Sequence, residues 1–123
     1  SMLASAREVV VWYEKALAQR SPHIEMAQYV RLAKLYLFLD KNYEAKEILL
    51  KACQHGPSAT TWLGLGLACY RQKELDQAEE ALSEANILDT KNAEVWGMLS
   101  LVAISSNKLD EGELTLNRAL KMG

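Results

Sequence analysis

Apolar residues recur along most of the chain every three to four positions, the spacing that places side chains on one face of an α-helix. Short polar or proline-containing stretches interrupt this pattern. The pattern predicts an all-α fold with seven helices. They are expected at Leu3–Arg20, Met26–Leu39, Tyr43–Gln54, Ala59–Gln72, Leu75–Leu88, Ala93–Ser105 and Leu109–Met122.

The interruptions between the predicted helices are short, so consecutive helices should lie antiparallel. Ser21-Pro22 disfavours helix because proline lacks an N–H group and restricts the residue before it. Gly56-Pro57-Ser58 combines a glycine expected in the left-handed conformation, a proline, and a serine that can cap the next helix. The chain is therefore predicted to form antiparallel helix pairs.

The helix pairs repeat, since Trp62 and Trp96 stand 34 residues apart in matching surroundings. Residues at equal offsets in the two stretches are Trp62, Leu65, Gly66, Tyr70, Ala78 and Ala85, and then Trp96, Leu99, Ser100, Ile104, Gly112 and Ala119. A repeat of this length is typical of helical hairpins stacked into a solenoid, which offers a surface for protein binding. Its small residues should mark where the two helices of a hairpin approach most closely, and its tryptophans should fill the core.

Composition narrows the classes of function. With 123 residues the chain fits one domain, and a net charge of −2 argues against a nucleic-acid-binding module. No apolar run reaches the ~20 residues that span a bilayer. Cys53 and Cys69 are best interpreted as buried hydrophobic residues in a reducing intracellular compartment. The isolated His23 and His55 form no catalytic set, so we expect no enzymatic activity, metal or cofactor.

A run of carboxylates falls on and beside one predicted second helix. Its members are Glu74, Asp76, Glu79, Glu80 and Glu84. Charge runs on amphipathic helices normally form a solvated outer face, and this is the favoured interpretation. The alternative is a contact for a basic partner.

The middle repeat reads Ala59-Thr-Thr-Trp62-Leu-Gly-Leu65-Gly66-Leu-Ala-Cys-Tyr70, and Ala78 and Ala85 follow. This arrangement resembles the tetratricopeptide repeat (TPR), although Lys73 stands where that family has a turn glycine and Thr90 where it has proline. The resemblance implies a right-handed superhelical solenoid. It covers residues 1–123 as a single TPR domain of about three and a half repeats, with the second helix of a truncated repeat at 3–20 and repeats at 26–58, 59–92 and 93–123. Ser1 and Met2 are expected to be cloning remnants, and the chain a fragment of a longer protein.

In TPR proteins the first helix of each hairpin lines a concave groove at set positions. The resemblance implies a partner-binding groove of Val30, Lys34, Leu37, Phe38, Leu63, Leu67, Tyr70, Arg71, Leu101 and Ile104. Such an apolar groove suits an amphipathic helix of a partner protein, with Lys34 and Arg71 orienting an acidic group. Alternatively, neighbouring helices or a second copy cover part of this surface, which would make the domain a structural spacer or a homotypic assembly unit.

TPR domains that hold chaperone tails grip a terminal carboxylate with lysine, asparagine and arginine at the fifth and ninth groove positions. The corresponding pairs here are Val30 and Lys34, Leu63 and Leu67, and Gly97 and Leu101. The clamp is absent, so we do not expect binding of chaperone tails.

Three strings carry a narrower resemblance: Thr61–Arg71, Ala81–Leu88 and Asn92–Trp96. They are similar to the C-terminal repeat array of a family of cilia- and flagella-associated proteins, most strongly between Gly56 and Val102. The resemblance implies a docking or assembly module in the cytoplasm or in the axoneme of a cilium or flagellum. Its partners would then be axonemal proteins.

Overall fold

The computed structural model describes residues 2–18 and 26–122, and all regular structure in these ranges is helical. The helices are α1 (Met2–Ala18), α2 (Met26–Phe38), α3 (Asn42–His55), α4 (Ala59–Arg71), α5 (Leu75–Leu88), α6 (Ala93–Ser105) and α7 (Leu109–Met122). The all-α prediction is confirmed. The predicted bounds of α5, α6 and α7 agree with the structure, whereas Ser21-Pro22 and His23 lie outside the described residues.

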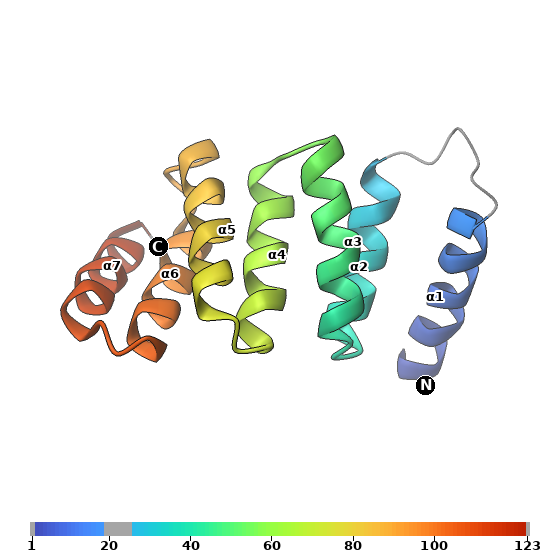
Figure 1. The fold of residues 1–123 in the computed structure, drawn as a ribbon, viewed down its shortest axis with the longest axis horizontal. Helices are drawn as coiled ribbons and strands as arrows, with labels where there is room; N and C mark the ends of the chain where they lie inside the picture. The colour runs from blue at the N-terminus through green and yellow to red at the C-terminus, as the bar shows by residue number, and fades with distance from the viewer. Residues whose placement is uncertain (1, 19–25, 123) are drawn as a thin grey trace.

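The helices follow one another along the long axis of the molecule, from α1 at one end to α7 at the other (Figure 1). Each packs on the next, and the first helices of successive hairpins, α2, α4 and α6, also touch in turn. In the described ranges, α3, α5 and α7 make no such contact with one another. Helices on the inside of a curved array approach more closely than those outside, so α2, α4 and α6 line the concave face.

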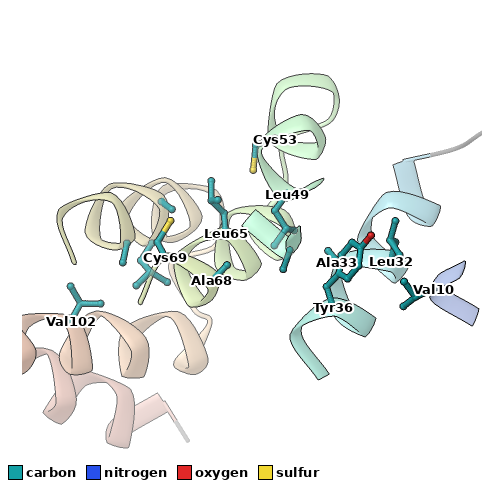
Figure 2. Close-up of a cluster of buried hydrophobic side chains, with 14 residues drawn as sticks. Val10, Leu32, Ala33, Tyr36, Leu49, Cys53, Leu65, Ala68, Cys69 and Val102 are labelled. Atoms are coloured by element: carbon teal, nitrogen blue, oxygen red, sulfur yellow. The ribbon is translucent and has the colours of Figure 1, made fainter. Parts of the chain in front are cut away.

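The core runs through successive hairpins as one continuous cluster, part of which Figure 2 shows. Leu32, Leu49, Leu65, Leu82 and Val102 are buried in it. Each buried leucine contributes about 1.5–3 kcal/mol through the removal of its side chain from water. This continuous core joins successive hairpins and supports the concave face.

The small residues lie where the two helices of a hairpin meet, as predicted. In the last hairpin, the Ser100 hydroxyl donates a hydrogen bond of 2.9 Å to the carbonyl oxygen of Gly112. In the middle hairpin, Ala78 is fully buried, and a Cβ atom added to Gly66 would lie 2.6 Å from Leu82 Cγ. A larger side chain at either position would push the helices apart.

An ion pair links two neighbouring hairpins. Lys46 Nζ on α3 lies 2.9 and 2.8 Å from the two carboxylate oxygens of Glu74, the residue before α5. The hydrogen bond with Glu74 raises the pKa of Lys46. Both side chains are partly screened from solvent, so the pair should hold better than a fully exposed one.

Both cysteines are buried, as expected for small hydrophobic residues. Burial raises the pKa of the Cys53 thiol and also that of the Cys69 thiol. Thiols with raised pKa values stay protonated at neutral pH and react slowly. This supports a packing role for both residues.

The predicted cap of α4 is present, whereas the predicted left-handed glycine is not. Ser58 Oγ accepts a hydrogen bond of 3.2 Å from the Thr61 N–H, and the Ser58 N–H donates one of 2.9 Å to Thr61 Oγ1. Gly56 has a φ of −155°, so the prediction for this residue was wrong. It precedes Pro57, and a residue before proline favours extended backbone.

Left-handed backbone occurs instead at the turns within the hairpins, at Asp40, Lys73 and Asn107, with φ values of 59°, 63° and 64°. Left-handed backbone costs an L-residue about 1–2 kcal/mol, least for Asn and Asp, whereas glycine adopts it freely. Because glycine also loses more entropy on folding, we expect Lys73→Gly to increase the free energy of unfolding by about 0.5–1 kcal/mol.

Urea denaturation followed by circular dichroism would measure this gain. Asn107→Gly is the matched control, since asparagine already tolerates the left-handed conformation and its replacement should gain less. A loss of stability in Lys73→Gly would contradict the left-handed geometry of this turn.

Candidate protein-binding groove

The concave face holds a cavity of about 340 Å³ between three first helices. It is lined by Lys34 and Leu37 of α2, by Thr60, Leu63, Gly64 and Leu67 of α4, and by Asn92, Glu94 and Met98 of α6. Four residues of the predicted groove, Lys34, Leu37, Leu63 and Leu67, therefore lie around one cavity. Most of the cavity wall is apolar.

Helical spacing explains why α4 forms the floor of this cavity. Thr60, Leu63, Gly64 and Leu67 stand at positions i, i+3, i+4 and i+7 and share one face of the helix. The opposite face carries Leu65 and Cys69, which are buried in the core. The packing of α4 in the solenoid therefore turns the cavity face outward.

Two charges of opposite sign border the cavity. Lys34 lies on its α2 side and Glu94 on its α6 side, with the apolar residues of α4 between them. Both side chains are exposed, and neither takes part in the ion pairs found among the described residues. The groove is thus basic on its α2 side and acidic on its α6 side.

A second hollow of about 420 Å³ lies by the turn that follows α4, and Tyr70, Arg71, Lys73, Leu75 and Ser105 line it. Tyr70 and Arg71 belong to the predicted groove. The hydroxyl oxygens of Tyr70 and Ser105 lie 3.3 Å apart, within hydrogen-bonding distance.

Arg71 has a structural contact that the sequence did not reveal. Its Nη1 donates hydrogen bonds of 2.8 Å to the Leu37 carbonyl and 3.3 Å to Asn42 Oδ1. Leu37 is in the last turn of α2, and its carbonyl oxygen also accepts a hydrogen bond of 3.1 Å from the Asp40 N–H. Arg71 therefore stabilises the end of α2, and Lys34 is the freer of the two predicted cations.

The remaining four predicted residues, Val30, Phe38, Leu101 and Ile104, line neither hollow. Val30 is half-buried, whereas the other three side chains are exposed. Ile104 Cγ1 would lie 2.6 Å from a Cβ atom added to Gly112, so Ile104 packs partly within its own hairpin.

Five residues line the cavity without belonging to the predicted groove: Thr60, Gly64, Asn92, Glu94 and Met98. Thr60 and Glu94 occupy groove positions of the TPR family, and the prediction passed over them in favour of apolar and basic side chains. The helical spacing of α4 could have identified Gly64. Asn92 also caps α6, since its Oδ1 accepts from the Glu94 N–H at 3.0 Å.

The acidic residues of α5 form a separate hollow on the convex face. Asp76, Glu79, Glu80, Ser83 and Glu84 line it, and all of them belong to one helix. Lys108 pairs with Glu79 at 3.4 Å, and both of these side chains are well exposed. These residues agree with the predicted solvated outer face, whereas Glu74 of the same run is partly screened in its ion pair with Lys46.

Within residues 2–18 and 26–122, no helix has the length and apolar character needed to cross a membrane. The same ranges contain no cluster of three or more histidine, cysteine or acidic side chains that could hold a metal ion.

A family model described as the cilia and flagella-associated protein 70 C-terminal domain matches residues 3–123. The chain belongs to this family. Curated members are the cilia- and flagella-associated protein 70 of Homo sapiens and that of Macaca fascicularis, each 47% identical to this chain over 95 residues. These matches cover 76% of this chain but only 8% and 9% of the two relatives.

Solved structures show that this cilia- and flagella-associated domain has a TPR fold. One structure of MamA superposes with a TM-score of 0.90 at 24% identity, covering 97% of this chain and 69% of MamA. The second TPR of Spaghetti (RPAP3), bound to an HSP90 peptide, gives a TM-score of 0.76 at 15% identity, over 80% of this chain and 92% of that one. The predicted TPR solenoid is confirmed, and the chain is a TPR-type domain of a cilia- and flagella-associated family.

Proposed function

We propose that the concave face of α2, α4 and α6 binds an amphipathic helix of another protein in the ciliary or flagellar axoneme, without catalysing a reaction. The observation that carries this proposal is the apolar cavity between Lys34 and Glu94. Axonemal placement rests on the name of the curated relatives.

The cavity specifies the chemistry of the bound helix. Leu37, Leu63, Leu67 and Met98 would receive apolar side chains spaced at i, i+3 or i+4, and i+7. Methionine adapts its shape to different partners, so Met98 would tolerate some variation in these anchors. An acidic residue near Lys34 and a basic residue near Glu94 would fix the orientation of the helix.

A chaperone tail is a poorer candidate for this groove, although the TPR of Spaghetti was solved with an HSP90 peptide. That peptide, SRMEEVD, is acidic. The cavity offers it Lys34 as a cation but also Glu94, which would repel a second carboxylate. The cavity therefore fits an amphipathic helix better than an acidic tail.

Leu67→Glu tests the groove, because it places an uncompensated carboxylate in the apolar wall. The probe would be a phage-displayed library of 18-residue helical peptides, from which the unmodified chain selects its binders. We expect selected peptides to share apolar residues at helical spacing with one acidic and one basic flank. Leu67→Glu should raise the Kd for the selected peptides by about 100-fold, since apolar anchors at an interface often contribute more than 2 kcal/mol to binding.

Leu88→Glu is the matched control, because Leu88 lies exposed on α5, outside the concave face. This variant should bind the selected peptides as the unmodified chain does, and circular dichroism should show both variants folded. Equal binding by the two variants would place the binding surface outside the groove and overturn the proposal. Failure of the library to yield any binder of this pattern would also overturn it.

A further inference from the structure

A further cavity, of about 360 Å³, opens on the convex side of the middle hairpin, where α3, α4 and α5 come together. Lys46 and Leu50 of α3, Trp62 and Leu65 of α4, and Glu80 of α5 border it. Most of its wall is apolar. One water molecule takes up about 30 Å³ in the liquid, so the cavity has room for a side chain.

The last hairpin shows how this solenoid covers the equivalent tryptophan. Trp96 stands 34 residues after Trp62, and the Arg118 guanidinium of α7 lies over its ring, 5.3 Å from the ring centre. A guanidinium is attracted to the negative face of an aromatic ring and stacks on it through its own flat surface. The chain therefore already contains one arginine–tryptophan pair of this geometry.

The middle hairpin has no cation at the matching place. The residue 34 positions before Arg118 is Glu84, whereas the first full repeat, which is one residue shorter, has Lys51 there. A carboxylate cannot replace the guanidinium, because the face of an indole ring is itself negative. Within residues 2–18 and 26–122, the Trp62 side chain has neither a cation–π contact nor a hydrogen bond.

Carboxylates at the cavity provide the charge that a cation needs. Glu80 borders both this cavity and the acidic hollow of α5, and Glu84 follows it one helical turn later. Both are exposed, and neither joins the ion pairs found in the described part of the chain. Like charges at i and i+4 repel each other, so a cation between them is favoured. Lys46 opposes this little, because Glu74 balances its charge.

We propose that an arginine of a different protein, carried by a segment that lies across the convex face, inserts into this cavity. Its guanidinium lies over Trp62 as Arg118 lies over Trp96. It also pairs with Glu80 and Glu84. Arginine suits the site better than lysine, because its planar group stacks on a ring while its N–H groups donate to carboxylates.

The position of the cavity and the charge of the chain favour a different protein as the source. Each repeat of a solenoid contacts only its neighbours, so further repeats would stack on the ends and leave the middle hairpin uncovered. This chain has a net charge of −2, so a basic segment of another protein complements the acidic face better than a second copy would. The site is separate from the concave groove.

Binding of N-acetylarginine amide, followed by NMR through the indole N–H signals, gives the first test. We expect the Trp62 signal, assigned with Trp62→Phe, to shift and saturate. The Trp96 signal should stay in place, because Arg118 already covers that ring. N-acetylcitrulline amide has nearly the same shape without the charge, and as the matched probe it should leave Trp62 unchanged.

Exchange of residues between the two hairpins tests the position of the site. Glu84→Arg should fill the cavity from within and abolish binding at Trp62, whereas Arg118→Glu should open Trp96 to the probe. Glu80→Gln should raise the Kd about tenfold, since it removes a charge-assisted hydrogen bond. Glu111→Gln removes the same charge from α7 and is the matched control, which should leave the Kd nearly unchanged.

Four results would overturn the proposal. They are no shift of the Trp62 signal, equal shifts with the two probes, binding that survives Glu84→Arg, and a Kd that Glu80→Gln leaves unchanged. A shift of the Trp62 signal with protein concentration alone would show that a second copy supplies the arginine, and would overturn the assignment to a different protein. Circular dichroism should show each variant folded.

Discussion

Replacing Leu82 with alanine is expected to lower the free energy of unfolding by about 3–5 kcal/mol. Leu82 has no exposed surface, and its Cγ and Cδ2 atoms lie against Gly66 of α4. The close fit leaves little freedom for the surroundings to collapse into the space, so the loss should include a cavity contribution. Chemical denaturation followed by circular dichroism would measure it.

The expected loss is large compared with the stability of a typical domain, which is about 5–15 kcal/mol. The stability of a solenoid comes both from packing within each hairpin and from contacts between neighbouring hairpins. Because α5 packs on α4 of its own hairpin and on α6 of the next, weakening α5 removes support from both. We therefore expect a broader unfolding transition in Leu82→Ala as well as an earlier one.

Leu88→Ala is the matched control, because the same substitution is made in the same helix at a side chain that is 53% exposed. It should cost less than about 1 kcal/mol. Similar losses in the two variants would contradict the orientation of α5 in the structure. A small loss in both would show that the position of Leu82 relaxes far more than its contacts suggest.

The helix bounds and hairpin contacts were predictable because they depend on local spacing and side-chain volume. Gly66 and Ala78 repeat 34 residues later as Ser100 and Gly112, and small residues at such positions permit close helix packing. Ser58 was recognisable as a cap because its oxygen needs only the N–H groups of the next turn. These features require no knowledge of distant contacts.

It was harder to predict which groove residues are free to contact a partner, because this depends on contacts between hairpins. Periodicity placed Leu63 and Leu67 on one face of α4, and the structure confirms that they share a cavity. Periodicity did not show that Arg71 bonds the Leu37 carbonyl, 34 residues away in the chain. A basic residue such as Arg71, which its helical position assigns to the groove, can therefore stabilise the fold instead of binding a partner.

The contacts of Trp96 likewise could not be predicted from the repeat pattern. The repeat predicts that Trp62 and Trp96 both fill the core, yet both side chains are half-buried, and of the two Trp62 packs against the core cluster. Trp96 Nε1 donates a hydrogen bond of 2.8 Å to the Thr90 carbonyl, and the Arg118 guanidinium lies 5.3 Å from the Trp96 ring centre. Trp96 therefore links the loop before α6 to α7, a role set by residues outside the repeat pattern.

Gly66→Ala and Gly97→Ala are expected to change stability in opposite directions. Both glycines lie inside first helices, where alanine is intrinsically favoured by about 0.5–1 kcal/mol. At Gly97 an added Cβ would meet no atom of another part of the structure within 4 Å, so Gly97→Ala should raise the free energy of unfolding by about 0.5–1 kcal/mol. At Gly66 the added Cβ would lie 2.6 and 2.8 Å from Leu82 Cγ and Cδ2.

Leu82 cannot retreat easily, because the clash involves its branch point and the residue is buried on all sides. Overpacking of this kind costs about 1–3 kcal/mol, which exceeds the helical gain. Urea denaturation of the two single variants and of the pair would separate the effects. A gain from both alanines would mean that α4 and α5 lie further apart than the structure places them, whereas a loss from both would mean that Gly97 is also covered.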